Sequence, residues 1–233
     1  MNNIEKIRLK LSLTVPVLFL IIMWLIKIIE YSLNLHLYTY GIYPQRLNCL
    51  TGIITAPFIH GSFEHLLSNT IPFLLLGTGL FYFYKESAYK VFLIIWLFSG
   101  FWVWLAARPA YHIGASGMIY GFASFLFFSG LLHKNRSMAA LSLLIVFIYG
   151  GMVWGVLPLK PEVSWESHLF GALTGFISAI IFAPKHIELS NAGETNENDD
   201  KFLYDFSNPE SFFEDITEVK WHYNEDENKK SEH

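Results

Sequence analysis

Six apolar stretches constrain the fold of this 233-residue chain more than any other feature. They occupy about residues 11–33, 66–84, 89–107, 114–132, 138–158 and 167–184, and Lys27 and Glu30 interrupt the first near its end. A helix of roughly 20 apolar residues crosses the hydrocarbon core of a bilayer, and backbone groups in lipid must pair within their own segment. The sequence therefore predicts an all-α membrane protein, a bundle of six transmembrane helices.

The connection between the first two stretches, about residues 34–65, is unusually long. Its second half reads LTGIITAPFIHGSF, which is apolar but interrupted by glycine and proline. Non-helical backbone is tolerated at membrane depth only where protein shields it from lipid. We therefore expect this first loop to be partly embedded at the membrane edge, against the bundle.

Charge is distributed unevenly along the chain. Residues 1–184 carry a net charge of +5 and residues 185–233 carry −9. This contrast predicts a six-helix membrane domain over 1–184 and an acidic, disordered tail over 185–233. The aromatic segments FLYDF and SFFEDITEVKWHY of the tail also allow a short docking helix. Eight Lys and Arg residues flank the spans on the side of the N-terminus and four flank the other side, which predicts cytoplasmic termini at both ends. The short polar loops and the helix count favour a bacterial inner membrane. The expected partner at this point is the lipid bilayer, with no nucleic acid.

Three groups of polar residues lie within the apolar part. His60, His65 and Asn69 are at the start of the second stretch, Ser116 is at the start of the fourth, and His168 is at the start of the sixth. Alternate spans enter the membrane from the same side, so the three groups are expected at one depth. Polar and ionisable residues are costly to bury in a membrane and therefore indicate function.

Each group taken alone also has a purely structural interpretation. His65 and Asn69, at positions i and i+4 of one helix face, could simply bond loop backbone. Ser116 lies among small residues that favour helix packing, and His168 precedes a Gly-x-x-x-Gly segment by one turn and could be a hydrogen bond within the bundle. The combination of the three groups, rather than any one of them, favours a site.

Nucleophilic chemistry needs a base within reach of a hydroxyl and donors for the oxyanion. Ser116 and His168 supply the first pair, and His65, Asn69 and the Ser116 backbone N–H supply such donors. An orienting acid is harder to find, because every Asp lies in the tail and Glu166, which is near His168 in sequence, is expected in the preceding loop. The sequence therefore predicts a Ser–His dyad rather than a Ser–His–Asp triad.

Three segments together resemble the rhomboid family of intramembrane serine proteases: HGSFEHLLSN at 60–69, GASG at 114–117 followed by Tyr120, and HLFGALTG at 168–175. Their order, spacing and helix placement are similar to a six-helix rhomboid core over about residues 10–184. The resemblance implies hydrolysis of peptide bonds in or next to transmembrane helices of membrane-protein substrates, without metal or cofactor.

The resemblance also implies a role for each residue. Ser116 would be the nucleophile and His168 the general base. Tyr120 would stack on the His168 ring and fix its orientation in place of a carboxylate. His65 and Asn69 would line the oxyanion hole. The whole supporting set is His60, His65, Asn69, Gly114, Ala115 and Tyr120.

Two departures from the family pattern stand out. Many members carry a Trp-Arg pair in the first connection, whereas here Arg46 follows Gln45, which leaves the anchoring of that loop open. Ser167 precedes the histidine where many members have alanine, a small residue of the same kind.

Two other functions compete with proteolysis. The first is a catalytically silent rhomboid-like scaffold that binds transmembrane helices. Against it, inactive family members lose the serine or the histidine, and this chain keeps both. The second is a metal transporter or metalloenzyme that uses His60, His65 and His168, since three histidines can bind zinc. A channel is disfavoured because no ring of pore-facing charges is visible.

Overall fold

The computed structural model describes residues 3–132, 140, 143–144, 155–157 and 163–182. The fifth expected span, 138–158, lies mostly outside the described residues, and the tail at 185–233 lies wholly outside them. Both remain predictions. The described elements are α1 (Asn3–Ser32), η1 (Leu37–Tyr40), η2 (Leu47–Cys49), α2 (Gly52–Thr55), η3 (Ala56–Phe58), α3 (Phe63–Phe83), α4 (Ala88–Ala106), α5 (Ser116–Leu132) and α8 (Trp165–Phe182).

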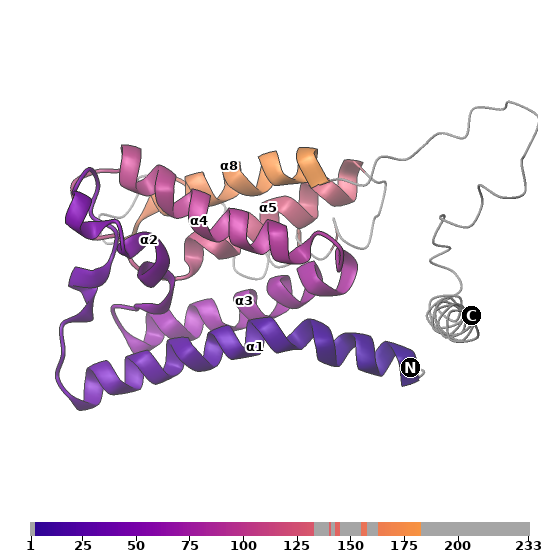
Figure 1. Cartoon of the computed structure of the whole chain (residues 1–233), viewed down its shortest axis with the longest axis horizontal. Coiled ribbons are helices and arrows are strands. Elements are labelled where there is room, and N and C mark those ends of the chain that lie inside the picture. The colour runs from indigo at the N-terminus through magenta and orange to yellow at the C-terminus, as the bar shows by residue number, and fades with distance from the viewer. Residues whose placement is uncertain (1–2, 133–139, 141–142, 145–154, 158–162, 183–233) are drawn as a thin grey trace, which may run out of the picture. The chain divides into compact units, whose positions relative to one another are not determined.

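The five other expected spans correspond to α1, α3, α4, α5 and α8, and all are helical (Figure 1). Most ends differ from the expectation by three residues or fewer. α1 is the exception, because it begins at Asn3 rather than near residue 11. Its charged first turns are too polar for a span but still helical. Arg8 anchors them by donating from Nη2 to the Tyr82 carbonyl at 2.7 Å.

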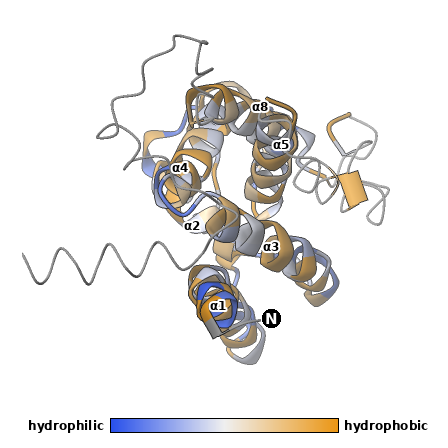
Figure 2. Ribbon diagram, turned by 90° about the vertical axis from the view of Figure 1, so that its right-hand side faces the viewer, coloured by the Kyte–Doolittle hydropathy of each residue, from blue (hydrophilic) through white to orange (hydrophobic). Residues whose placement is uncertain are grey.

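Four of the described helices are long and apolar enough to cross a membrane, namely α1, α3, α4 and α8. α5 is equally apolar but shorter, with 17 residues. Figure 2 shows apolar residues predominating along the helices. Leu11, Leu18 and Leu25, spaced seven apart on α1, are 69%, 55% and 52% exposed. An outer face this apolar is suited to lipid, so the chain is a multi-pass integral membrane protein.

The helices pack as an all-α bundle in which α5 lies along α8 and α1 lies along α3 (Figures 1 and 2). The α5–α8 contact depends on glycine. A Cβ added at Gly171 would collide with the Gly117 carbonyl, and one at Gly175 would collide with the Gly121 carbonyl. Two backbones in such close contact leave little room between the starts of α5 and α8.

The first connection is held by α4 and by the loop before α5. Trp104 Nε1 donates to the Arg46 carbonyl at 3.0 Å, and Ile42 pairs with His112 in an isolated antiparallel bridge. Gly100 lets Ile53 approach the α4 backbone, since a Cβ there would lie 3.1 Å from Ile53 Cγ2. A tryptophan from α4 therefore anchors the loop that lacks the Trp-Arg pair.

Candidate active site

Ser116 and His168 meet where α5 and α8 begin. Ser116 is the first residue of α5 and follows a turn at Gly114, whose φ of +103° favours glycine. His168 lies in the first turn of α8 and is 8% exposed. Ser116 Oγ lies 2.8 Å from His168 Nε2, although the residues are 52 positions apart in sequence. This distance is a good hydrogen bond.

Two contacts orient the His168 ring. Nδ1 lies 2.8 Å from the Gly155 carbonyl, which can only accept, so we assign the ring proton to Nδ1. Nε2 is then an acceptor and faces the Ser116 hydroxyl. The Tyr120 ring stacks on the imidazole with centroids 4.2 Å apart and planes 6° apart. The Gly155 carbonyl thus occupies the place where a triad would have its acid, and the Tyr120 ring covers one face of the imidazole.

Glu166 does not lie in a loop, as the sequence suggested, and that expectation is wrong. α8 begins at Trp165, so Glu166 is in its first turn, where a helix favours an acid. The side chain is 3% exposed, and Oε1 lies 3.3 Å from the Arg108 backbone nitrogen and 3.6 Å from Arg108 Nε. Its described contacts are with Arg108, whereas the described ring contacts of His168 are with Ser116, Tyr120 and Gly155.

Gly114 and Ala115, in the turn before Ser116, lie next to the two expected histidines, His65 and His60. A Cβ at Gly114 would lie 2.9 Å from His65 Cε1, so any other residue at this position would displace the imidazole. The Ala115 amide lies 3.4 Å from His60 Nε2. His60 is 1% exposed, and its burial, followed by the neighbouring His65, lowers its pKa to about 3, so the ring is neutral at pH 7.

Asn69 bonds backbone, as its purely structural interpretation predicts, and it also faces the site. Its Nδ2 donates to the His65 carbonyl of its own helix at 2.8 Å. The side chain is 4% exposed and also lines the site cavity. It is therefore fixed in place in the cavity that Ser116 also lines.

One supporting residue escaped the sequence reading. In the sequence, Lys27 and Glu30 interrupt the first span, and Lys27 is one of the four cations that flank the spans on the side opposite the N-terminus. Lys27 Nζ donates to the His60 carbonyl at 2.9 Å and to the Gly61 carbonyl at 3.2 Å, and it pairs with Glu30 at 2.8 Å. α1 therefore holds the turn that carries His60. A lysine and a glutamate three positions apart at the end of an apolar helix are the signal that could have identified it.

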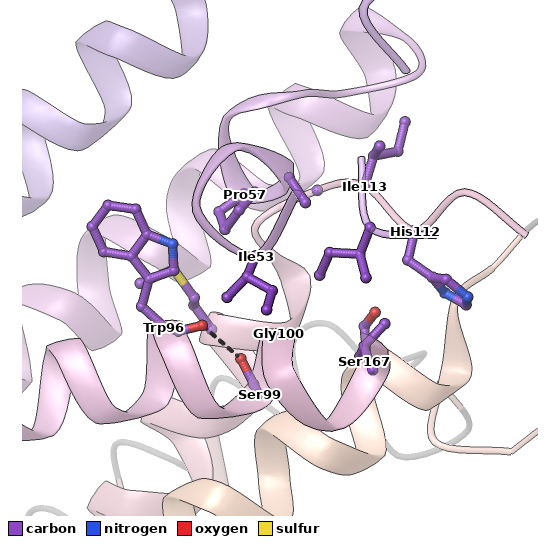
Figure 3. A pocket seen from close by; sticks show the side chains of 14 residues that line it. Ile53, Pro57, Trp96, Ser99, Gly100, His112, Ile113 and Ser167 are labelled. Carbon is purple, nitrogen blue, oxygen red and sulfur yellow. Dashed lines mark hydrogen bonds between the residues drawn. The ribbon is translucent and has the colours of Figure 1, made fainter. Parts of the chain in front are cut away.

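A cavity of about 700 Å³ is lined by part of this set, but not by Lys27, His60, Gly114 or Ala115. Its lining includes His65, Asn69, Ser116, Tyr120 and His168. A second cavity of about 30 Å³, room for one water, lies on the other side of the serine turn, against α4 (Figure 3). Within the described ranges, no three His, Cys, Asp or Glu side chains are grouped so that they could hold a metal ion.

Comparisons with known proteins identify the family. Residues 48–185 match the family model of the Rhomboid domain. The chain is 34% identical over 179 residues to uncharacterised proteins of Mycobacterium bovis and Mycobacterium tuberculosis, covering 71% of this chain and 72% of each relative. It is 26% identical over 130 residues to a protein of Acanthamoeba polyphaga mimivirus that is named as a rhomboid protein, covering 54% of this chain and 71% of that one. Together with the helical bundle, these matches place the chain in the rhomboid family.

Proposed function

We propose that this chain is an intramembrane serine endopeptidase that hydrolyses peptide bonds in or next to transmembrane helices of membrane-protein substrates. The observation that carries the proposal is the 2.8 Å contact between Ser116 Oγ and His168 Nε2 within a large cavity. The bond from His168 Nδ1 to the Gly155 carbonyl supports it, because it leaves Nε2 free to accept a proton.

The chemistry would proceed in two stages. Ser116 Oγ attacks the scissile carbonyl carbon while its proton passes to His168 Nε2. The resulting imidazolium keeps a partner at each nitrogen and then protonates the leaving amine. Water, deprotonated by His168, then attacks the ester on Ser116, and His168 returns a proton to Ser116 Oγ as the second product leaves. Donors near the serine turn, from His65, Asn69 and the backbone, would stabilise the oxyanion.

The proposal includes a place in the cell. Lys and Arg are more frequent on one side of the spans, which orients both termini toward the cytoplasm. The site, at the start of the second, fourth and sixth spans, then faces the opposite side of the membrane. We assign the chain to a bacterial inner membrane, where single-pass proteins would be the substrates.

Labelling with a serine-directed fluorophosphonate tests this function. The detergent-purified full chain should be labelled at Ser116, and both Ser116→Ala and His168→Ala should abolish labelling. Ser68→Ala is a matched control, because this hydroxyl lines the same cavity but donates to its own helix at the His65 carbonyl. A folded wild-type chain that resists labelling and leaves every co-reconstituted single-pass protein intact would favour the silent scaffold instead.

A further inference from the structure

A second serine–histidine pair lies beside the first. Here the histidine comes from the segment leading into α5 and the serine from the segment leading into α8, the reverse of the Ser116–His168 pair. His112 Nδ1 lies 2.6 Å from Ser164 Oγ, and these residues are 52 positions apart, as Ser116 and His168 are. His112 precedes Ser116 by four residues, and Ser164 precedes His168 by four. The segments leading into α5 and α8 therefore lie side by side in one register.

The donor and the acceptor of each hydrogen bond in this second pair can be assigned. His112 Nε2 lies 3.0 Å from the Arg108 carbonyl, which can only accept, so Nε2 carries the ring proton. Burial lowers the pKa of His112, which is 2% exposed, so the ring is neutral and Nδ1 is an acceptor. Ser164 must then donate its hydroxyl hydrogen to Nδ1. Ser167, whose Oγ lies 2.6 Å from Ser164 Oγ, must donate to Ser164 in turn.

This order argues against Ser164 as a second nucleophile. Its oxygen receives the Ser167 hydroxyl and also faces the Ser167 backbone N–H at 3.4 Å. Its lone pairs are therefore engaged. We call the series of hydrogen bonds from Ser167 through Ser164 to His112 the serine relay. It links the start of α8 to the segment before α5 and has no chemical role of its own.

The serine relay ends next to the candidate base. Ser167 immediately precedes His168 in α8, and its carbonyl approaches α5 so closely that a Cβ on Gly117 would lie 3.1 Å from it. Figure 3 shows His112 and Ser167 on the same side of the small cavity, from separate segments of the chain. Any movement of the start of α8 away from the serine turn has to break this relay.

We propose that His112 is a positioning residue for the Ser116–His168 pair, acting through Ser164 and Ser167 to hold the start of α8 against the segment that leads into Ser116. The inference rests on the proposed protease function for its effect on rate. The contact itself can be tested without that function.

The experiment uses the full-length protein in proteoliposomes with a single-pass substrate. The variants are His112→Leu, Ser164→Ala and the conservative Ser164→Thr, which keeps the hydroxyl. His36→Leu, at an exposed histidine of the first connection, is the matched control. For each variant we would measure kcat, KM, the rate and end point of fluorophosphonate labelling, the melting temperature, and amide hydrogen exchange over residues 164–168.

His112→Leu and Ser164→Ala should lower kcat about 10- to 100-fold, the cost of slight misplacement of reacting groups. His112 and Ser164 line the site cavity, but their polar atoms already bond to protein partners. KM should therefore stay within about twofold. Ser164→Thr should restore most of kcat, and His36→Leu should match the wild type. The labelling end point should stay constant while its rate falls, which a simple loss of folded protein would not produce.

Other outcomes separate the two proposals. Unchanged kcat in folded His112→Leu and Ser164→Ala would overturn the positioning role, as would a loss that tracks the labelling end point. A wild-type chain that is not labelled at Ser116 would overturn the protease function instead. In that case faster exchange over 164–168 in Ser164→Ala would still support the holding contact, and unchanged exchange would overturn it.

Discussion

The rings of Tyr120 and His168 lie parallel, with planes 6° apart and centroids separated by 4.2 Å. Tyr120 follows Ser116 by one turn of α5, so one helix carries both the hydroxyl and the ring that orients its partner. A flat aromatic surface fixes the plane of an imidazole without adding charge. This arrangement suits a buried site whose chain has every Asp in the tail.

Replacing Tyr120 separates ring stacking from bulk. Tyr120→Leu should slow fluorophosphonate labelling of Ser116 about 10-fold, since an aromatic pair contributes roughly 0.5–1.5 kcal/mol beyond the area it buries. Tyr120→Phe keeps a ring over His168 and should stay within about threefold of the wild type. Labelling of the Leu variant at the wild-type rate would show that stacking does not orient the histidine.

Gly171→Ala should destabilise the bundle. In an ordinary helix, replacing glycine by alanine stabilises the helix by about 1 kcal/mol. Here the new Cβ would collide with the Gly117 carbonyl and push α8 away from α5. We expect the free energy of unfolding in detergent to fall by about 1–3 kcal/mol. Gly61→Ala is the matched control, because a Cβ at Gly61 would have nothing within 4 Å. Equal stability of the two variants would contradict the close α5–α8 contact.

Lys27→Met should weaken the turn at His60 and Gly61. It removes the donor to both carbonyls and leaves Glu30 without its cation. Hydrogen bonds to charged groups contribute about 1.5–3 kcal/mol, so a loss of that size in unfolding free energy is expected, with slower labelling of Ser116. Lys10→Met, at an exposed lysine of the same helix, should change neither measurement. If both variants behave alike, Lys27 does not support the site.

Acid should destabilise the folded chain through its buried histidines. The pKa of His60 is about 3 when folded, because the ring is buried and lies near His65, against an ordinary value of 6.5. The unfolded state therefore binds more protons below pH 6.5, and stability falls as the pH drops from about 6.5 toward 3. His112, whose pKa burial also lowers, acts in the same direction.

Thermal unfolding in detergent between pH 7.5 and 5 measures this effect. The melting temperature should fall with pH, and His60→Gln should make the decline shallower, because one group accounts for up to about 1.4 kcal/mol per pH unit. An identical slope in the variant would mean that His60 is not held neutral.

The membrane architecture followed from the sequence because it rests on long local patterns. Each described span is a run of apolar residues that only a helix can place in lipid, so most ends were predicted to within three residues. α1 was the exception, since apolarity says where lipid is crossed but not where a helix begins. The convergence of the polar groups was also predictable, because alternate spans start at the same side of a membrane.

The sequence by itself thus determined the all-α bundle and which polar residues would share one depth. Only the tertiary structure decided which of their atoms meet. In the structure, Ser116 bonds to His168 and Glu166 contacts Arg108. Lys27 bonds to the His60 carbonyl, and His112 bonds to Ser164. These contacts link residues 33 to 58 positions apart. The contacts of Ser116 with His168, Glu166 with Arg108 and His112 with Ser164 depend on the register of α5 and α8, which glycine packed against backbone sets. No local pattern of residues specifies that register.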